Sequence, residues 1–253
     1  MSSILRLVWF DLKPELKPPV WIFAEWTTFL IQISIYGAII SQLVTGIDNY
    51  RQFYAVGLVI MITFDMGTHT GRHFVEDAHE GRLPYLLSLP ISRSQLFLTI
   101  ALQGGVELAL MLAVPLTVAL LVIGNLTWIS VIACVITLFG LGFGVAGLML
   151  ALSFIAFKSS DLYSAIVTGL SALIIRFSTV LYPFIFLPAQ YATAASFSPL
   201  TYGSDLVRLI LGFDPNILMN PVYAIGVIAA LSVSTLILGM FLVQRLVEGV
   251  KSG

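Results

Sequence analysis

The sequence predicts an all-α membrane protein with six transmembrane helices, and three observations lead to this fold class. Of its 253 residues, 58% are hydrophobic and only 10% are charged. The mean hydropathy of +1.00 lies outside the range of soluble globular proteins. Long apolar stretches recur along the chain, and each span needs about 20 apolar residues to cross the hydrocarbon core. We therefore expect residues 1–253 to form a single transmembrane domain.

Composition and missing motifs exclude several classes of function. The net charge of -1 excludes the basic field of a nucleic-acid-binding protein, and the one cysteine, Cys134, excludes a disulfide framework. No Gly-Lys pair occurs, so the chain has no phosphate-binding loop for ATP, and neither H-E-x-x-H nor G-x-S-x-G is present. We expect no nucleic-acid partner, no enzymatic activity, no catalytic residues, no metal and no cofactor bound by this chain.

Residues 1–19 predict a helix lying in the membrane interface. Leu5, Trp9 and Leu12 recur on one helical face, and Trp9 is typical of an interfacial anchor. Pro14 leaves a second interpretation open, in which this segment is a loose leader to the first span.

The six spans follow in order, separated by short polar or proline-marked segments. We expect them near residues 20–44, 52–74, 93–123, 128–157, 162–187 and 221–244.

The segment between the second and third spans is the longest polar interruption in the first half of the chain. Glu76, Asp77 and Glu80 precede leucines at helical spacing, and Pro90 ends this amphipathic pattern. Ser92 and Gln95 then form an S-x-x-Q capping box, flanked by Ile91 and Leu96 as a hydrophobic staple. We therefore expect one helix along the membrane surface and a new helix that begins at Arg93.

Residues 188–213 form the second informative segment. They are too apolar for a solvated loop and too few to cross the membrane twice. Ser198 and Pro199 suit the N-cap and first turn of a short helix that ends at Gly212. Two short re-entrant helices in the outer leaflet are the prediction for this segment.

Basic residues set the orientation, because they concentrate in cytoplasmic loops. With both termini in the cytoplasm, only Arg51 and Arg208 lie outside, and Arg176 lies within a span. The cytoplasmic set is Arg6, Lys13, Lys17, Arg72, Arg82, Arg93, Lys158, Arg245 and Lys251. We expect a multi-pass protein of the cell membrane, with the acidic segment facing the cytosol.

Two motifs resemble one family of transporters. Glu80-Gly81 followed by L-x-x-L-L-S-L-P-I-S-R-S resembles the cytoplasmic element of the type-2 ATP-binding-cassette (ABC) exporter permeases. The motif S-P-L-T-Y-G-S-D-L-V-R before the last span and the six spans extend this resemblance over nearly the whole chain.

The resemblance implies that residues 76–92 form a coupling helix docked on a separate ATPase subunit, which binds ATP and Mg. It also implies a second permease copy, identical or related, and export of an amphiphilic or hydrophobic substrate such as a drug, a lipid or a lipid-linked glycan. The expected coupling residues are Glu76, Glu80, Gly81, Leu89, Pro90, Ile91, Ser92 and Arg93.

Three ionisable residues are expected inside spans, where an unpaired charge is costly. They are Asp65, Glu107 and Arg176. An ion pair between Arg176 and one of the carboxylates would reduce the cost, either as a lock between helices or as part of a transport path.

A polar stripe along the second span leaves several interpretations open. Its members share one helical face and are Asp65, His69, Arg72, His73 and Glu76. The stripe could line an inward vestibule, relay protons, or simply form the wet end of a helix; His69 and His73 have metal-binding spacing, but no further ligand joins them. These residues also support the alternative function, a stand-alone proton- or cation-coupled carrier or channel.

Small and aromatic residues each allow two interpretations. The G-x-x-x-G spacing of Gly140 and Gly144 suits close helix packing, either within one subunit or between two copies. The aromatic residues around Tyr182 and Tyr191 suit an interfacial belt or an exit surface for an amphiphilic substrate.

Overall fold

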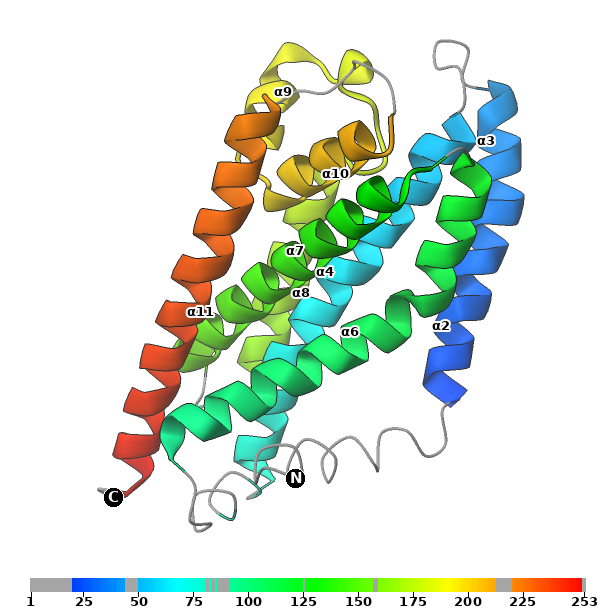
Figure 1. The fold of residues 1–253 in the computed structure, drawn as a ribbon. Helices are drawn as coiled ribbons and strands as arrows, with labels where there is room; N and C mark the ends of the chain where they lie inside the picture. The colour runs from blue at the N-terminus through cyan, green and yellow to red at the C-terminus, as the bar shows by residue number, and fades with distance from the viewer. Residues whose placement is uncertain are drawn as a thin grey trace.

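The computed structural model describes residues 20–43, 50–80, 82, 85, 92–124, 126–156, 159–212 and 220–251 of the chain. Every regular element in these ranges is a helix, which confirms the all-α fold class (Figure 1). The predicted interfacial helix of residues 1–19 lies outside the described residues.

Each predicted span overlaps a helix or a continuous helical run. The bounds agree closely for all of them except the predicted fifth span, residues 162–187. The long elements are α2 (Val20–Ile31) continuing through the π-helical turn η1 (Gln32–Tyr36) into α3 (Gly37–Leu43), α4 (Tyr50–His79), α6 (Arg93–Ile123), α7 (Trp128–Ala156), α8 (Ser160–Arg176) and α11 (Pro221–Lys251).

Four helical segments in the described residues are long and apolar enough to cross a membrane. They are Val20–Leu43, Gln95–Ile123, Trp128–Ser153 and Pro221–Leu242. The predicted second span corresponds to α4, whose polar stripe lowers its hydropathy. The predicted fifth span corresponds to α8, which has 17 residues, somewhat fewer than the about 20 that a perpendicular crossing needs.

The predicted end of the fifth span at residue 187 is wrong, because the helix ends at Arg176. Residues 177–182 are not helical, and long-range contacts stabilise this conformation. The Thr179 N–H donates to Thr201 Oγ1 at 3.3 Å. The absence of a side chain at Gly57 lets the Val180 carbonyl lie directly against α4.

The short helices α9 (Ala189–Ala195) and α10 (Pro199–Ile210) confirm that residues 188–213 contain two helices. Ser198 occupies the predicted N-cap position, but its hydroxyl donates to the Ile174 carbonyl at 3.1 Å instead of capping α10. Both short helices lie at the end of the bundle opposite to the end of α4 and the start of α6 (Figure 1).

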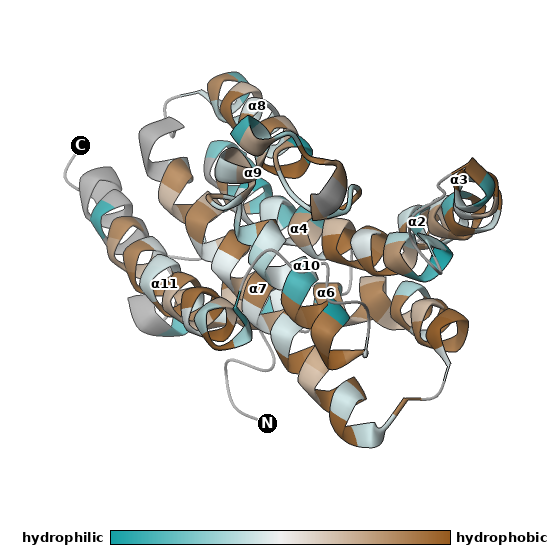
Figure 2. Cartoon of the chain, turned by 90° about the horizontal axis from the view of Figure 1, so that it is seen from above, coloured by the Kyte–Doolittle hydropathy of each residue, from teal (hydrophilic) through white to brown (hydrophobic). Residues whose placement is uncertain are grey.

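Helices α4 and α7 form the centre of the bundle. Helix α7 packs against α11 and α4, and α4 also packs against α6 and α8. Phe64, Leu138 and Leu141 are fully buried between them. Hydrophobic residues run along the outer helices α6, α8 and α11 (Figure 2), as expected for helices surrounded by lipid.

The glycines of α7 pack against α11 of the same chain. The Ser232 hydroxyl donates to the Gly140 carbonyl at 2.5 Å, and the Thr235 hydroxyl donates to the Gly144 carbonyl at 2.8 Å. A methyl group on Gly147 would come within 2.6 Å of the Thr235 backbone. The G-x-x-x-G face is therefore used for packing within one subunit.

Replacing Gly147 with alanine is expected to destabilise the bundle by about 1–3 kcal/mol, because the added methyl group overpacks the α7–α11 contact. The matched control is Gly169→Ala on α8, where an added methyl group meets nothing within 4 Å. Thermal unfolding in detergent should show a lower Tm for Gly147→Ala and an unchanged or higher Tm for Gly169→Ala. Equal Tm values would contradict the close helix contact.

Candidate functional site

The structure confirms the predicted capping box at the start of α6. Ser92 Oγ accepts from the Gln95 N–H at 3.2 Å, and Gln95 Oε1 accepts from the Ser92 N–H at 2.9 Å, so the capping box is complete. Arg93 begins the helix. Glu76 and Glu80 are exposed near the end of α4. Other expected coupling residues lie outside the described residues, namely Gly81, Leu89, Pro90 and Ile91.

Polar side chains continue from this end of α4 into the bundle. Arg82 Nη1 donates to Asp77 Oδ1 at 3.2 Å, and His73 Nδ1 lies 3.7 Å from Asp77 Oδ2. The His73 and His69 rings lie 5.8 Å apart between their centroids. Of the predicted polar stripe, His69 and His73 are therefore neighbouring side chains, and Asp77 and Arg82 extend this polar series toward the end of α4.

Glu107 on α6 joins this series from the facing helix. Only 6% of its surface is exposed, and its Oε1 accepts from Gln103 Nε2 at 3.0 Å. Its Oε2 lies 3.7 Å from His69 Nδ1, a buried atom that has no hydrogen-bond partner among the described residues. The structure thus brings two predicted residues together, one from each helix.

A cavity of about 160 Å³ lies where α2, α4 and α6 meet. Asp65 and His69 reach it from α4, so one further predicted residue, Asp65, shares a site with His69. The complete lining is Trp21, Glu25, Trp26, Ile62, Asp65, Met66, His69, Met111 and Pro115. Asp65 and Glu25 are both exposed, which shows that the cavity opens at the protein surface.

The aromatic walls of this cavity are held in place by contacts with the other helices. The Trp21 ring stacks on the His69 ring at a centroid distance of 6.1 Å and an interplanar angle of 15°. Trp26 Nε1 donates to the Met111 carbonyl at 3.1 Å. Sequence reasoning missed Trp21 and Glu25 as site residues, although their spacing of four places them on one face of α2.

A smaller cavity of about 30 Å³ follows the polar series toward the end of the bundle. Thr70, His73 and Asp77 line it from α4, and Gln103 and Glu107 line it from α6. The polar stripe therefore borders space over more than one helical turn.

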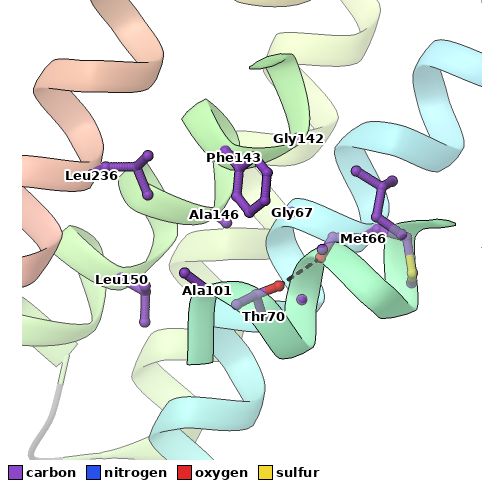
Figure 3. A pocket seen from close by; sticks show the side chains of 12 residues that line it. Met66, Gly67, Thr70, Ala101, Gly142, Phe143, Ala146, Leu150 and Leu236 are labelled. Atoms are coloured by element: carbon purple, nitrogen blue, oxygen red, sulfur yellow. Dashed lines mark hydrogen bonds between the residues drawn. The ribbon is translucent and has the colours of Figure 1, made fainter. Parts of the chain in front are cut away.

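Helix packing closes the bundle on the other side of α4. In Figure 3, Met66, Gly67 and Thr70 of α4 face residues of α6 and α7 around a space of about 10 Å³. That volume is at the lower limit for a single water molecule. A ligand can therefore be accommodated between α2, α4 and α6, and no comparable space exists at the Figure 3 contact.

Arg176 does not form the expected ion pair. It lies in the last turn of α8 with an exposed side chain, and among the described residues it forms no ion pair with Asp65 or Glu107. Because α8 ends earlier than predicted, Arg176 lies at a helix end and does not need a carboxylate partner. The predicted ion pair between Arg176 and one of these carboxylates is therefore wrong, and a place for Arg176 on a transport path stays a prediction.

The arginine that is buried is Arg208, on α10. Its Nη1 and Nη2 donate to the carbonyl oxygens of Thr179 and Val180 at 2.8 and 2.7 Å. Its guanidinium lies 3.4 Å from the centroid of the Phe53 ring, and Nη1 lies 3.9 Å from Asp205 Oδ1. Arg208 therefore joins α10 to α4 and to the segment after α8.

Arg208 keeps its charge despite its burial. Burial lowers the pKa of its guanidinium to about 9, and the nearby Asp205 and Tyr50 oppose that change. A pKa in this range leaves the side chain protonated at neutral pH. The charge-assisted hydrogen bonds to the two carbonyl oxygens are therefore retained under physiological conditions.

The described residues contain no group of three or more histidine, cysteine, aspartate or glutamate side chains that could hold a metal ion. His69 and His73 lie close together, but they face Glu107 and Asp77 separately.

Comparisons with known proteins add no family assignment. No protein-family model matches the chain, and no curated protein sequence matches it significantly.

Replacing Arg208 with leucine is expected to destabilise the protein by about 3–5 kcal/mol, because it leaves Asp205 buried without its positive partner. Arg176→Leu is the matched control and should change stability by less than about 0.5 kcal/mol, since Arg176 is exposed. Chemical unfolding of both purified variants measures the difference. A mild effect of Arg208→Leu would contradict a structural role for this contact.

Proposed function

We propose that this chain is the membrane-spanning permease subunit of an ABC transporter, with six crossings and both termini in the cytoplasm of the cell. A separate cytosolic ATPase binds ATP and Mg and drives export of an amphiphilic substrate. A second permease copy, identical or related, completes the transporter. One observation carries this proposal. The acidic segment that resembles the coupling element of these permeases, residues 76–92, runs from the end of α4 to the start of α6 in the sequence, and these two helices carry the polar side chains of the candidate site.

The position of the segment supports a mechanical role. It connects α4 to α6, and both helices line the cavity: Asp65 and His69 belong to α4, and Met111 and Pro115 belong to α6. A force applied by the ATPase to the connecting segment would move both walls. ATP-driven closure could therefore change the accessibility of the cavity without any direct contact between ATP and this chain.

The start of α6 is suited to transmit such a force. The reciprocal hydrogen bonds of Ser92 and Gln95 stabilise the first turn by about 1 kcal/mol, which limits fraying. Leu96 and Phe97 are buried in the next positions. Movement at Ser92 is therefore passed to the body of the helix rather than absorbed by local unfolding.

Charge reversal at Glu80 is expected to reduce ATP-driven transport by about tenfold or more, because like charges at a docking contact cost at least about 1.4 kcal/mol. The measurement uses inside-out vesicles containing the chain and a coexpressed ATPase from its gene neighbourhood. Asp161→Lys is the matched control, since Asp161 is also an exposed acid, in the first turn of α8.

Two results would contradict this proposal. The first is equal transport by Glu80→Lys, Asp161→Lys and the unmodified chain. The second is transport that persists when the Walker A lysine of the ATPase is replaced by alanine. Both variants must be present in the membrane in equal amounts, which immunoblotting establishes.

The polar series between α4 and α6 favours a second candidate function, a stand-alone proton- or cation-coupled carrier or channel. His69, Glu107 and His73 lie close enough to exchange protons through intervening water. The purified chain alone, reconstituted with a proton gradient, would then move its substrate without ATP. Such transport would replace the exporter proposal with this alternative.

A further inference from the structure

We propose that the cavity between α2, α4 and α6 binds the positively charged head group of a cationic amphiphile, such as a protonated amine or a quaternary ammonium compound. The inference deepens the proposed export function and rests on it, because it names the class of substrate. Three features of the cavity carry it: its charge, its aromatic walls and its size.

Two carboxylates without partners give the cavity its negative charge. Glu25 and Asp65 line it from different helices, and among the described residues neither side-chain carboxylate forms a hydrogen bond or an ion pair. The nearest basic side chain on α4, Arg72, lies two turns away and is exposed. His69 presents its Nδ1 to Glu107. A bound cation would compensate both carboxylates.

The aromatic walls suit an organic cation rather than a metal ion. Indole rings attract ammonium groups through their π faces, and desolvated contacts of this kind are worth about 2 kcal/mol. Trp21 and Trp26 are already held by the His69 ring and the Met111 carbonyl, so little side-chain ordering is needed on binding. Met66 and Met111 add polarisable thioethers.

The size of the cavity limits what can enter. Its volume of about 160 Å³ is close to the roughly 150 Å³ of an engineered apolar cavity that accepts benzene. A head group of that size fits, whereas a whole drug molecule does not. Because Glu25 and Asp65 are exposed, the cavity is open, and an attached apolar chain can remain in the surrounding lipid.

This charge also discriminates among the substrate classes that the sequence left open. A lipid-linked glycan carries phosphate groups, which the carboxylates of Glu25 and Asp65 would repel. A neutral lipid would leave both carboxylates uncompensated. Cationic drugs or cationic lipids are the classes that the cavity favours.

Binding can be tested with the purified chain in lipid nanodiscs, without ATP or a partner. The probe is benzyltrimethylammonium, and its neutral isostere neopentylbenzene is the control ligand. Calorimetric titration should give a Kd for the cation at least about tenfold lower than for the isostere, the equivalent of about 1.4 kcal/mol.

Variants then assign the binding to this cavity. Asp65→Asn and Glu25→Gln should each weaken cation binding by about tenfold, and Trp26→Phe should weaken it less, since phenylalanine is a poorer cation–π partner. Asp161→Asn, on α8 and outside the cavity, should bind like the unmodified chain. The Tm of each variant establishes that it is folded.

The outcomes separate this inference from the proposed function. Equal affinity for the cation and its isostere, or unchanged binding by Asp65→Asn and Glu25→Gln, would overturn the cation site. ATP-driven export of an anionic or neutral substrate, with no cation binding, would overturn the site and leave the exporter. Cation binding by the purified chain without any ATP-driven transport would support the site and remove the exporter.

Discussion

The structure depends on the shielding of the polar residues that α4 carries through the bundle. An ionisable side chain exposed to hydrocarbon costs at least about 2.5–3.5 kcal/mol, so such residues must face protein or a wet cavity. Helix α4 meets this constraint by lying at the centre, with α6, α7 and α8 around it. Its His69 faces Glu107, and its Asp65 faces the open cavity. The arrangement of the other helices follows from covering this one.

Shielding is unequal on the two sides of α4. Toward α7, the small residues Gly67 and Gly71 allow close approach, and Met149 and Val145 occupy the space. Toward α2, larger side chains meet without filling the gap, and two carboxylates remain accessible. The close packing of α4 against α7 provides a scaffold. The cavity between α2, α4 and α6 provides the space that ligand binding and helix movement require. This asymmetry is why the candidate site lies at the edge of the bundle and not in its core.

Local signals predicted much of the fold, and long-range contacts account for what was missed. The starts of α6, α10 and α11 follow from the Ser92 capping box and from Pro199 and Pro221, which act within a few residues. The end of α8 depends instead on Thr201 and Arg208, more than twenty residues further along the chain. Likewise, helical spacing predicted that Asp65 and His69 share a face, but no pattern indicated that α2 would supply Glu25 and the indoles.

The π-helical turn at Gln32–Tyr36 changes how the first span can be interpreted. Before it, α2 packs against α6; after it, α3 packs against α4. The wider turn shifts the register of the helix, so the two halves present different sequence positions to the bundle. A single helical wheel drawn through residues 20–43 would therefore misplace one half, and substitutions in α3 are not informative about the orientation of Trp21 and Glu25.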